Sequence, residues 1–156
     1  MANENKEEKV YSFEELLDLR GSFVWRTSGG SMRPLIKQGR DVVVISKPEG
    51  RLKKYDVALY KVRDKYLLHR ILEVHDGYYT AAGDNNTFLE KVPDQSVIGV
   101  MTELQRKNKP YDLSGKKYRF YEKAWCGRFR FKCAVLKPYR AVLRGLHACK
   151  SKIKKK

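Results

Sequence analysis

Three polar segments of this chain carry side chains that could act together in acyl transfer. The first is the turn at 28–34, in which two glycines precede Ser31. The second is His69, which stands inside an apolar, strand-like run, and the third is a loop that contains Asp84 and Glu90. A hydroxyl nucleophile, an imidazole base and a carboxylate that orients the imidazole are the parts of a serine hydrolase. Their order along the chain predicts a hydrolytic site.

The serine turn is suited to hold a substrate carbonyl. Its glycines allow a sharp turn and a close approach of the backbone, and each N–H donor of an oxyanion hole is worth roughly 3–4 kcal/mol. We therefore expect an oxyanion and substrate loop around Ser31, formed by Ser28, Gly29, Gly30 and Met32. Taken alone, the same residues also fit an ordinary glycine-rich hairpin with an exposed serine.

His69 and the two acids each allow a second interpretation. Strand alternation places His69 on one face with Leu67 and Ile71, so it is expected to point toward a buried or cleft side. An imidazole titrates near pH ~6.5 and can serve as a general base at neutral pH. It could equally be a hydrogen-bonded core histidine. Asp84 could orient the imidazole or stabilise its own loop by Asx-turn bonding, and Glu90 is a second acid in the same region.

The elements that must position these residues are predicted to be short antiparallel strands. Ser12 and Glu15 form a capping-box pattern for a helix that Gly21 ends. Strands are expected at 22–27, 41–45, 57–62, 66–74, 78–82 and 97–104, separated by turn residues. The fold class is therefore predicted to be mainly β, a compact and mostly antiparallel domain with a short N-terminal helix.

Composition divides the chain into a leader, a domain and a tail. We expect a disordered leader over 1–10, a catalytic β domain over 11–113 and a basic, largely helical tail over 114–156. Residues 1–113 carry 19 basic and 17 acidic side chains, whereas 114–156 carry 15 and one. In the tail, Gly127 interrupts one aromatic helical face, and Pro138 stands where a second amphipathic helix can begin.

Cysteine usage and hydropathy favour a cytosolic protein without a metal site. The three cysteines lie in the tail without zinc-type spacing, which suits a reducing compartment and predicts neither metal nor other cofactor. The first residues are polar and acidic, and no run approaches the ~20 apolar residues of a membrane span. We therefore expect neither a signal peptide nor a transmembrane anchor.

Five ordered segments resemble one known superfamily. The sequence Ser-Gly-Gly-Ser-Met-Arg-Pro-Leu from position 28 resembles the serine box of type I signal peptidases and of the related self-cleaving SOS repressors. Residues 39–43, 54–58, 68–71 and 83–86 resemble the later boxes in the same order, so the resemblance covers about residues 24–104. It implies a peptidase fold with Ser31 as nucleophile and His69 as general base. The histidine is typical of the endoplasmic-reticulum and archaeal branch, since the bacterial enzymes and repressors use lysine.

The resemblance leaves two candidates for the acid of the triad. Asp84 matches the acid of the Gly-Asp-Asn box, and Glu90 matches a further acid assigned to the triad in the eukaryotic enzymes; we favour Asp84. The chain departs from the family at Gly29, where many signal peptidases carry a serine that donates to the oxyanion. Backbone N–H groups or Ser28 would then supply the donors. The basic tail has no counterpart in the family's catalytic core.

These observations predict a serine endopeptidase that cuts an extended peptide, such as a leader or signal peptide, held by β-augmentation beside the strand before Ser31. Seven of the 18 aromatic residues lie among the basic residues of 114–156, which suits an anionic membrane surface at ~1 kcal/mol per basic side chain. A helix packed on the β domain and a nucleic-acid patch are the other interpretations, and nucleic acid is the least favoured. The expected location is cytoplasmic, peripheral at the inner face of the membrane.

Two alternative functions remain open. A self-cleaving repressor cuts an Ala-Gly or Cys-Gly bond upstream of its serine, but no such pair precedes Ser31 and the pair Cys126–Gly127 follows it. A non-enzymatic peptide- or membrane-binding module with a relic site belongs to a different class. The joint presence of Ser31, His69 and Asp84 disfavours it.

Overall fold

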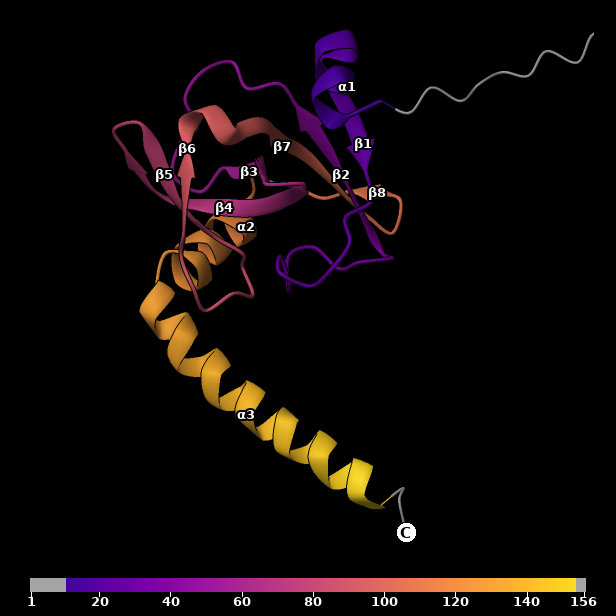
Figure 1. Cartoon of the computed structure of the whole chain (residues 1–156), viewed down its shortest axis with the longest axis vertical. Helices are drawn as coiled ribbons and strands as arrows, with labels where there is room; N and C mark the ends of the chain where they lie inside the picture. The colour runs from indigo at the N-terminus through magenta and orange to yellow at the C-terminus, as the bar shows by residue number, and fades with distance from the viewer. Residues whose placement is uncertain (1–10, 154–156) are drawn as a thin grey trace, which may run out of the picture.

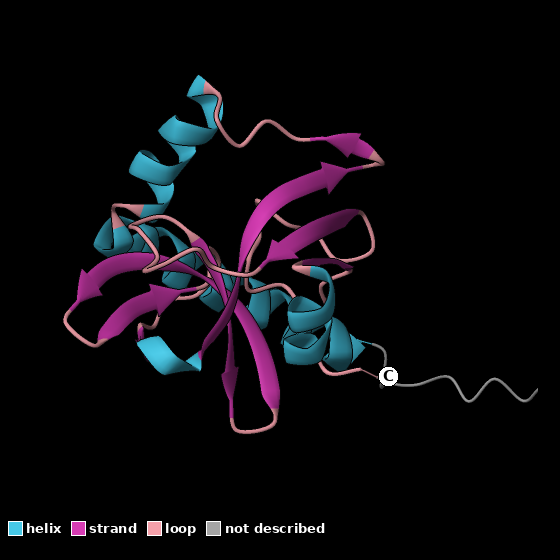
Figure 2. Ribbon diagram, turned by 90° about the horizontal axis from the view of Figure 1, so that it is seen from above, coloured by secondary structure: helices cyan, strands magenta, loops and turns pink. Residues whose placement is uncertain are grey.

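The computed structural model of the chain describes residues 11–153, with their side chains as far as Val142. The predicted leader over 1–10 lies outside the described residues. The fold is mainly β: eight antiparallel strands form a curled half-barrel sheet, preceded by one short helix and followed by helices (Figures 1 and 2). The predicted fold class is therefore confirmed.

The strands are β1 (Ser22–Trp25), β2 (Asp41–Ser46), β3 (Val57–Val62), β4 (Lys65–His75), β5 (Tyr78–Ala82), β6 (Glu90–Pro93), β7 (Val97–Arg106) and β8 (Lys109–Pro110). The helices are α1 (Phe13–Arg20), η1 (Asp94–Ser96), α2 (Lys116–Tyr121), η2 (Glu122–Cys126) and α3 (Phe129–Ile153). The sheet order is β1-β2-β7-β3-β4-β5-β6, and β8 pairs with β7. All strand pairs are antiparallel.

The N-terminal helix begins and ends where its capping residues predict. The Ser12 side chain accepts from the Glu15 backbone while the Glu15 side chain accepts from the Ser12 backbone, which completes the capping box. Gly21 ends the helix with a φ of +71°, in the left-handed region that glycine adopts without strain. The buried Leu17 then fixes α1 against the sheet.

The hydrophobic core holds both the sheet and the serine turn. One cluster unites Val43 and Leu59 of the sheet with Met32, the residue after Ser31, and with Ile36, five residues after it. A second cluster, around Tyr60, Ala58, Ile71, Tyr79, Ala81, Val92 and Leu52, fills the region where β3, β4 and β5 meet. The serine turn is therefore anchored by its own buried apolar side chains, so the position of Ser31 is set by the core.

The C-terminal helices cover one end of the sheet and then leave it. Tyr118 of α2 reaches the first core cluster, and Cys126 of η2 packs on Leu72 and Ala82. Gly127 separates η2 from α3, as predicted. The long α3 projects away from the β domain in Figure 1.

The structure corrects one boundary in this segment. Pro138 lies inside α3 instead of at a helix start. Proline in a helix interior removes one hydrogen bond to the carbonyl four residues earlier. That carbonyl belongs to Ala134, and both residues are exposed, so water can take the place of the missing donor. Within the described part of the chain, no helix is both long and apolar enough to cross a membrane.

Candidate active site

His69 is held by a carboxylate and a phenol at one of its two ring nitrogens. The residue lies on β4, opposite Ala58 of β3, and is 3 % exposed. Its Nδ1 lies 2.5 Å from Glu90 Oε2 and 2.8 Å from the hydroxyl of Tyr60. The Tyr60 hydroxyl also donates to Glu90 Oε2 at 2.7 Å. Three buried or half-buried polar groups thus share one hydrogen-bond network.

The electrostatics of this network place a proton on Nδ1. Burial acts to raise the pKa of Glu90, but hydrogen bonds from His69 and Tyr60 outweigh it and the pKa falls below its ordinary value. Burial, followed by the hydrogen bond and charge of Glu90, raises the pKa of Tyr60 strongly. Glu90 is therefore an ionised acceptor beside Nδ1, which leaves Nε2 as the ring nitrogen that the acid does not engage.

The preference for Asp84 as the acid beside His69 is wrong in the structure. Asp84 is buried and makes a bidentate ion pair with Arg70, at 2.9 Å from Nε to Oδ1 and 2.9 Å from Nη2 to Oδ2. It also accepts from the hydroxyl of Tyr121 at 2.8 Å. Neighbours on a strand point to opposite faces, so Arg70 draws Asp84 away from the face of His69. Asp84 builds the loop instead of orienting the base.

The loop that Asp84 occupies binds the serine turn through its backbone. The N–H of Asn85 donates to the carbonyl oxygen of Ser31 at 2.7 Å, and the Asn85 side chain donates to the carbonyl oxygen of Gly30 at 3.1 Å. A Cβ on Gly83 would lie 2.6 Å from that Ser31 oxygen, closer than real Cβ atoms approach. Position 83 therefore requires glycine, because the loop 83–85 and the serine turn pack in direct backbone contact.

The turn itself keeps a limited set of oxyanion donors. Gly29 has a φ of +87°, and its N–H donates to the side chain of Gln38 at 3.0 Å, so that N–H is engaged. The N–H groups of Ser28, Gly30, Ser31 and Met32 have no acceptor among the residues that the structure describes. They are the backbone groups available for a developing oxyanion.

A small cavity of about 60 Å³ opens beside Ser31. Its lining comes from the serine turn, the end of β1 and the start of β4: Trp25, Thr27, Ser28, Gly29, Ser31, Met32, Ile36, Tyr66, Leu67 and Leu68. His69 follows directly on this lining but is not part of it, and no hydrogen bond joins His69 to Ser31 within residues 11–142. In sites without substrate such contacts are often long and tighten only on binding.

The structure adds residues that sequence reasoning missed. Trp125 of η2, with Lys132 and Arg140 of α3, donates to backbone carbonyl oxygens of the loop 83–85. Lys132 is 1 % exposed, and burial lowers its pKa although the charge of Asp84 acts in the opposite direction. Their aromatic and basic character was visible in the sequence, but only the fold shows that they fix the loop that binds the serine turn.

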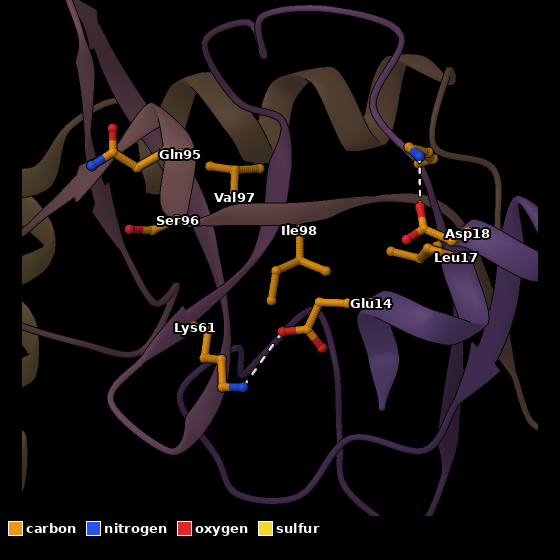
Figure 3. Close-up of a pocket in the computed structure, with 9 residues that line it drawn as sticks. Glu14, Leu17, Asp18, Lys61, Gln95, Ser96, Val97 and Ile98 are labelled. Carbon is orange, nitrogen blue, oxygen red and sulfur yellow. Dashed lines mark hydrogen bonds and ion pairs between the residues drawn. The ribbon is translucent and has the colours of Figure 1, made fainter. Parts of the chain in front are cut away.

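A larger cavity, of about 360 Å³, lies between α1, the end of β3 and the start of β7 (Figure 3). Its walls carry two ion pairs, Lys61–Glu14 at 3.5 Å and Lys47–Asp18 at 2.7 Å. No residue predicted for catalysis lines it. The smaller cavity, which Ser31 borders, is therefore the better candidate for substrate.

The chain was compared with models of protein families, with curated proteins and with solved structures, and none of them matches it. The candidate site is thus defined by its geometry. In the part of the chain that the structure describes, no three His, Cys, Asp or Glu side chains gather as metal ligands.

Proposed function

We propose that this protein is a serine endopeptidase of the signal-peptidase type, with Ser31 as nucleophile, His69 as general base and Glu90 as the acid that orients the base. The observation that carries the proposal is the 2.5 Å contact between Glu90 Oε2 and His69 Nδ1. This contact fixes the tautomer in which Nε2 can accept a proton, which is the property a general base needs.

The mechanism follows from these roles. Nε2 of His69 takes the proton of the Ser31 hydroxyl as Oγ attacks the carbonyl carbon of the scissile bond. Backbone N–H groups of the serine turn receive the oxyanion of the tetrahedral intermediate. His69 then gives its proton to the departing amine, and an acyl-serine ester remains. Water, activated by the same imidazole, hydrolyses the ester and restores the Ser31 hydroxyl.

The substrate proposed for this site is an extended peptide. Within residues 11–153, β1 ends the sheet and pairs with β2 alone, so its other edge is available to add a strand. The chain runs from that edge strand into the serine turn, and Val24 of β1 is 67 % exposed. A peptide paired along β1 would be led toward Ser31, and the small cavity would receive one side chain next to the cleaved bond.

The test is covalent labelling of Ser31. Wild type is incubated with a fluorophosphonate or a boronic-acid probe, and adducts are measured by intact mass and located by peptide mapping. We expect one adduct on Ser31, none on Ser31→Ala, and strongly reduced labelling on His69→Ala. Absence of an adduct on the wild type at every pH tested, with both probes, would overturn the proposal in favour of a binding module. Labelling that survives His69→Ala but is lost in Lys61→Ala or Lys65→Ala would assign the base elsewhere.

A further inference from the structure

The outer side of α3 carries an apolar stripe that the β domain does not cover. The side chains lie four, four and three positions apart, which places them along one face of a helix. They are Phe131 at 59 %, Val135 at 41 %, Tyr139 at 59 % and Val142 at 61 % exposed. At 1.5 Å per residue the stripe is about 16 Å long. Exposed apolar side chains grouped in this way mark an interaction surface.

The inner side of the same helix is already used. Leu136 is buried, and Lys132 and Arg140 donate to carbonyl oxygens of the loop beside the serine turn. The apolar stripe therefore cannot turn toward the β domain without breaking these contacts. The orientation of α3 relative to the sheet determines which face remains outside.

The charge of α3 indicates which kind of partner the apolar stripe binds. Residues 129–153 contain seven Lys or Arg residues and no Asp or Glu. Two of the basic residues bind the inner loop, whereas Arg130 and Lys137 are exposed. Arg130 and Lys137 lie about 100–120° around the helix from Phe131, so the exposed cations and the apolar stripe occupy different faces of one amphipathic helix. Such a helix suits a surface that offers both anionic headgroups and an apolar layer beneath them.

We propose that the outer face of α3 docks on an anionic membrane surface, with its axis in the plane of the interface and the stripe 131–142 inserted among the acyl chains. The proposal goes beyond peptide cleavage, since it concerns a face of α3 that bears none of the catalytic groups. Each exposed basic side chain near such a surface contributes roughly fivefold to partitioning, and the inserted apolar side chains contribute the remainder.

Two other partners fit the stripe less well. Pairing with a second copy would place two helices of the same strong positive charge side by side, which costs affinity. Nucleic acid would use the cations and could stack on Phe131 or Tyr139, but Val135 and Val142 offer it neither stacking nor hydrogen bonds. A lipid surface uses every residue of the stripe.

Sedimentation with vesicles tests the docking surface. The full-length chain is mixed with vesicles of phosphatidylcholine and phosphatidylserine, or of phosphatidylcholine alone. We expect binding to the anionic vesicles only, and weaker binding as salt rises. A variant combining Phe131→Gln, Val135→Gln, Tyr139→Gln and Val142→Gln should bind at least about tenfold more weakly, because its apolar face is lost while its charge is kept. Glutamine is a good helix former, and circular dichroism checks that the helix is retained.

The matched control changes exposed apolar residues elsewhere. Leu19→Gln with Val74→Gln alters side chains that are 66 % and 42 % exposed on the β domain, and should bind vesicles as the wild type does. Ser31→Ala should also bind normally, so a failed protease proposal leaves this result intact. The proposal is overturned if the stripe variant binds as well as wild type, or if wild type ignores anionic vesicles. In the second case, retention of labelled duplex DNA or RNA, or a stripe-dependent dimer in light scattering, would identify the other partner.

Discussion

At the level of single residues, two acids near the end of β5 have different partners. Glu90 receives the proton-bearing nitrogen of His69, while Asp84 neutralises the buried guanidinium of Arg70. Both acids were visible in the sequence, but sequence alone could not assign them. The assignment depends on which face of β4 each acid reaches, and β6, which carries Glu90, is too short to show a strand pattern.

Removal of the Glu90 charge should affect chemistry more than stability. In Glu90→Gln the amide can no longer hold Nδ1–H as an anion does, so the tautomer with a free Nε2 loses its support. We expect the rate of Ser31 acylation to fall by roughly 10²–10⁴-fold. The labelling rate, measured against pH by intact mass, checks this.

Asp84→Asn is the matched variant with the opposite expectation. It leaves the fully buried guanidinium of Arg70 without a counter-charge, and breaking such a pair costs about 3–5 kcal/mol of unfolding free energy. Urea unfolding followed by circular dichroism measures this loss. The assignment of the two acids fails if Glu90→Gln proves the less stable protein and Asp84→Asn unfolds at the same urea concentration as wild type.

A single methyl group at position 83 should displace the serine turn from the loop 83–85. The added Cβ of Gly83→Ala would lie 2.6 Å from the Ser31 carbonyl oxygen, a backbone atom that cannot rotate away. The serine turn must then shift and lose its hydrogen bond from Asn85. We expect labelling of Ser31 to fall at least about tenfold, since small misplacements of reacting groups are costly. A melting temperature near that of wild type, together with unchanged labelling, would contradict the expected clash.

At the level of elements, the helices and strands that depend on residues close in sequence could be predicted correctly. The capping box of α1 and the strands β2, β3, β4 and β5, which are apolar runs bounded by turn residues, follow from residues close in sequence. β6 and β8 escaped prediction because they are short and owe their pairing to neighbouring strands. The continuation of α3 through Pro138 was not predicted, because the exposed helix can lose one backbone hydrogen bond to water at that position.

The C-terminal helices are expected to be part of the folding unit of the β domain. A chain ending at residue 113 would uncover Leu72 and Ala82 and would remove the Tyr121 hydroxyl and the Trp125 indole from Asp84 and its loop. We therefore expect residues 1–113 to give a loosely packed protein with poor dispersion in proton NMR spectra. The matched comparison is a chain ending at residue 142, which keeps these contacts and should give native dispersion. A well-dispersed spectrum for residues 1–113 would contradict this view.

For the molecule as a whole, buried carboxylates should set the acid limit of stability. Burial acts to raise the pKa of Asp41, but hydrogen bonds from Arg40 and the Lys37 backbone outweigh it, and the pKa lies below its ordinary 3.8. Glu90 likewise lies below its ordinary 4.5. A carboxyl whose pKa is lower in the folded state stabilises the protein above its unfolded pKa and loses that contribution as pH falls through the folded value.

The unfolding free energy is therefore expected to be constant near neutrality with respect to these two groups and to decrease as pH falls below about 4.5. Urea titrations at a series of pH values measure this decrease. Asp41→Asn should flatten the acid part of the profile, and Glu73→Gln, which changes a side chain that is 65 % exposed, is the surface control for the loss of one carboxylate. A profile that rises toward acid would contradict the expected direction.

The contacts of Trp125, Lys132 and Arg140 with the loop 83–85 also bear on biosynthesis. During translation the β domain is synthesised first, so the nascent chain already contains Ser31, His69 and both acids. The loop that supports the serine turn acquires these three partners only after residues 125–140 have emerged. A site arranged in this way is completed late in synthesis, so a truncated translation product would contain Ser31, His69 and both acids and still lack the contacts that hold the serine turn in place.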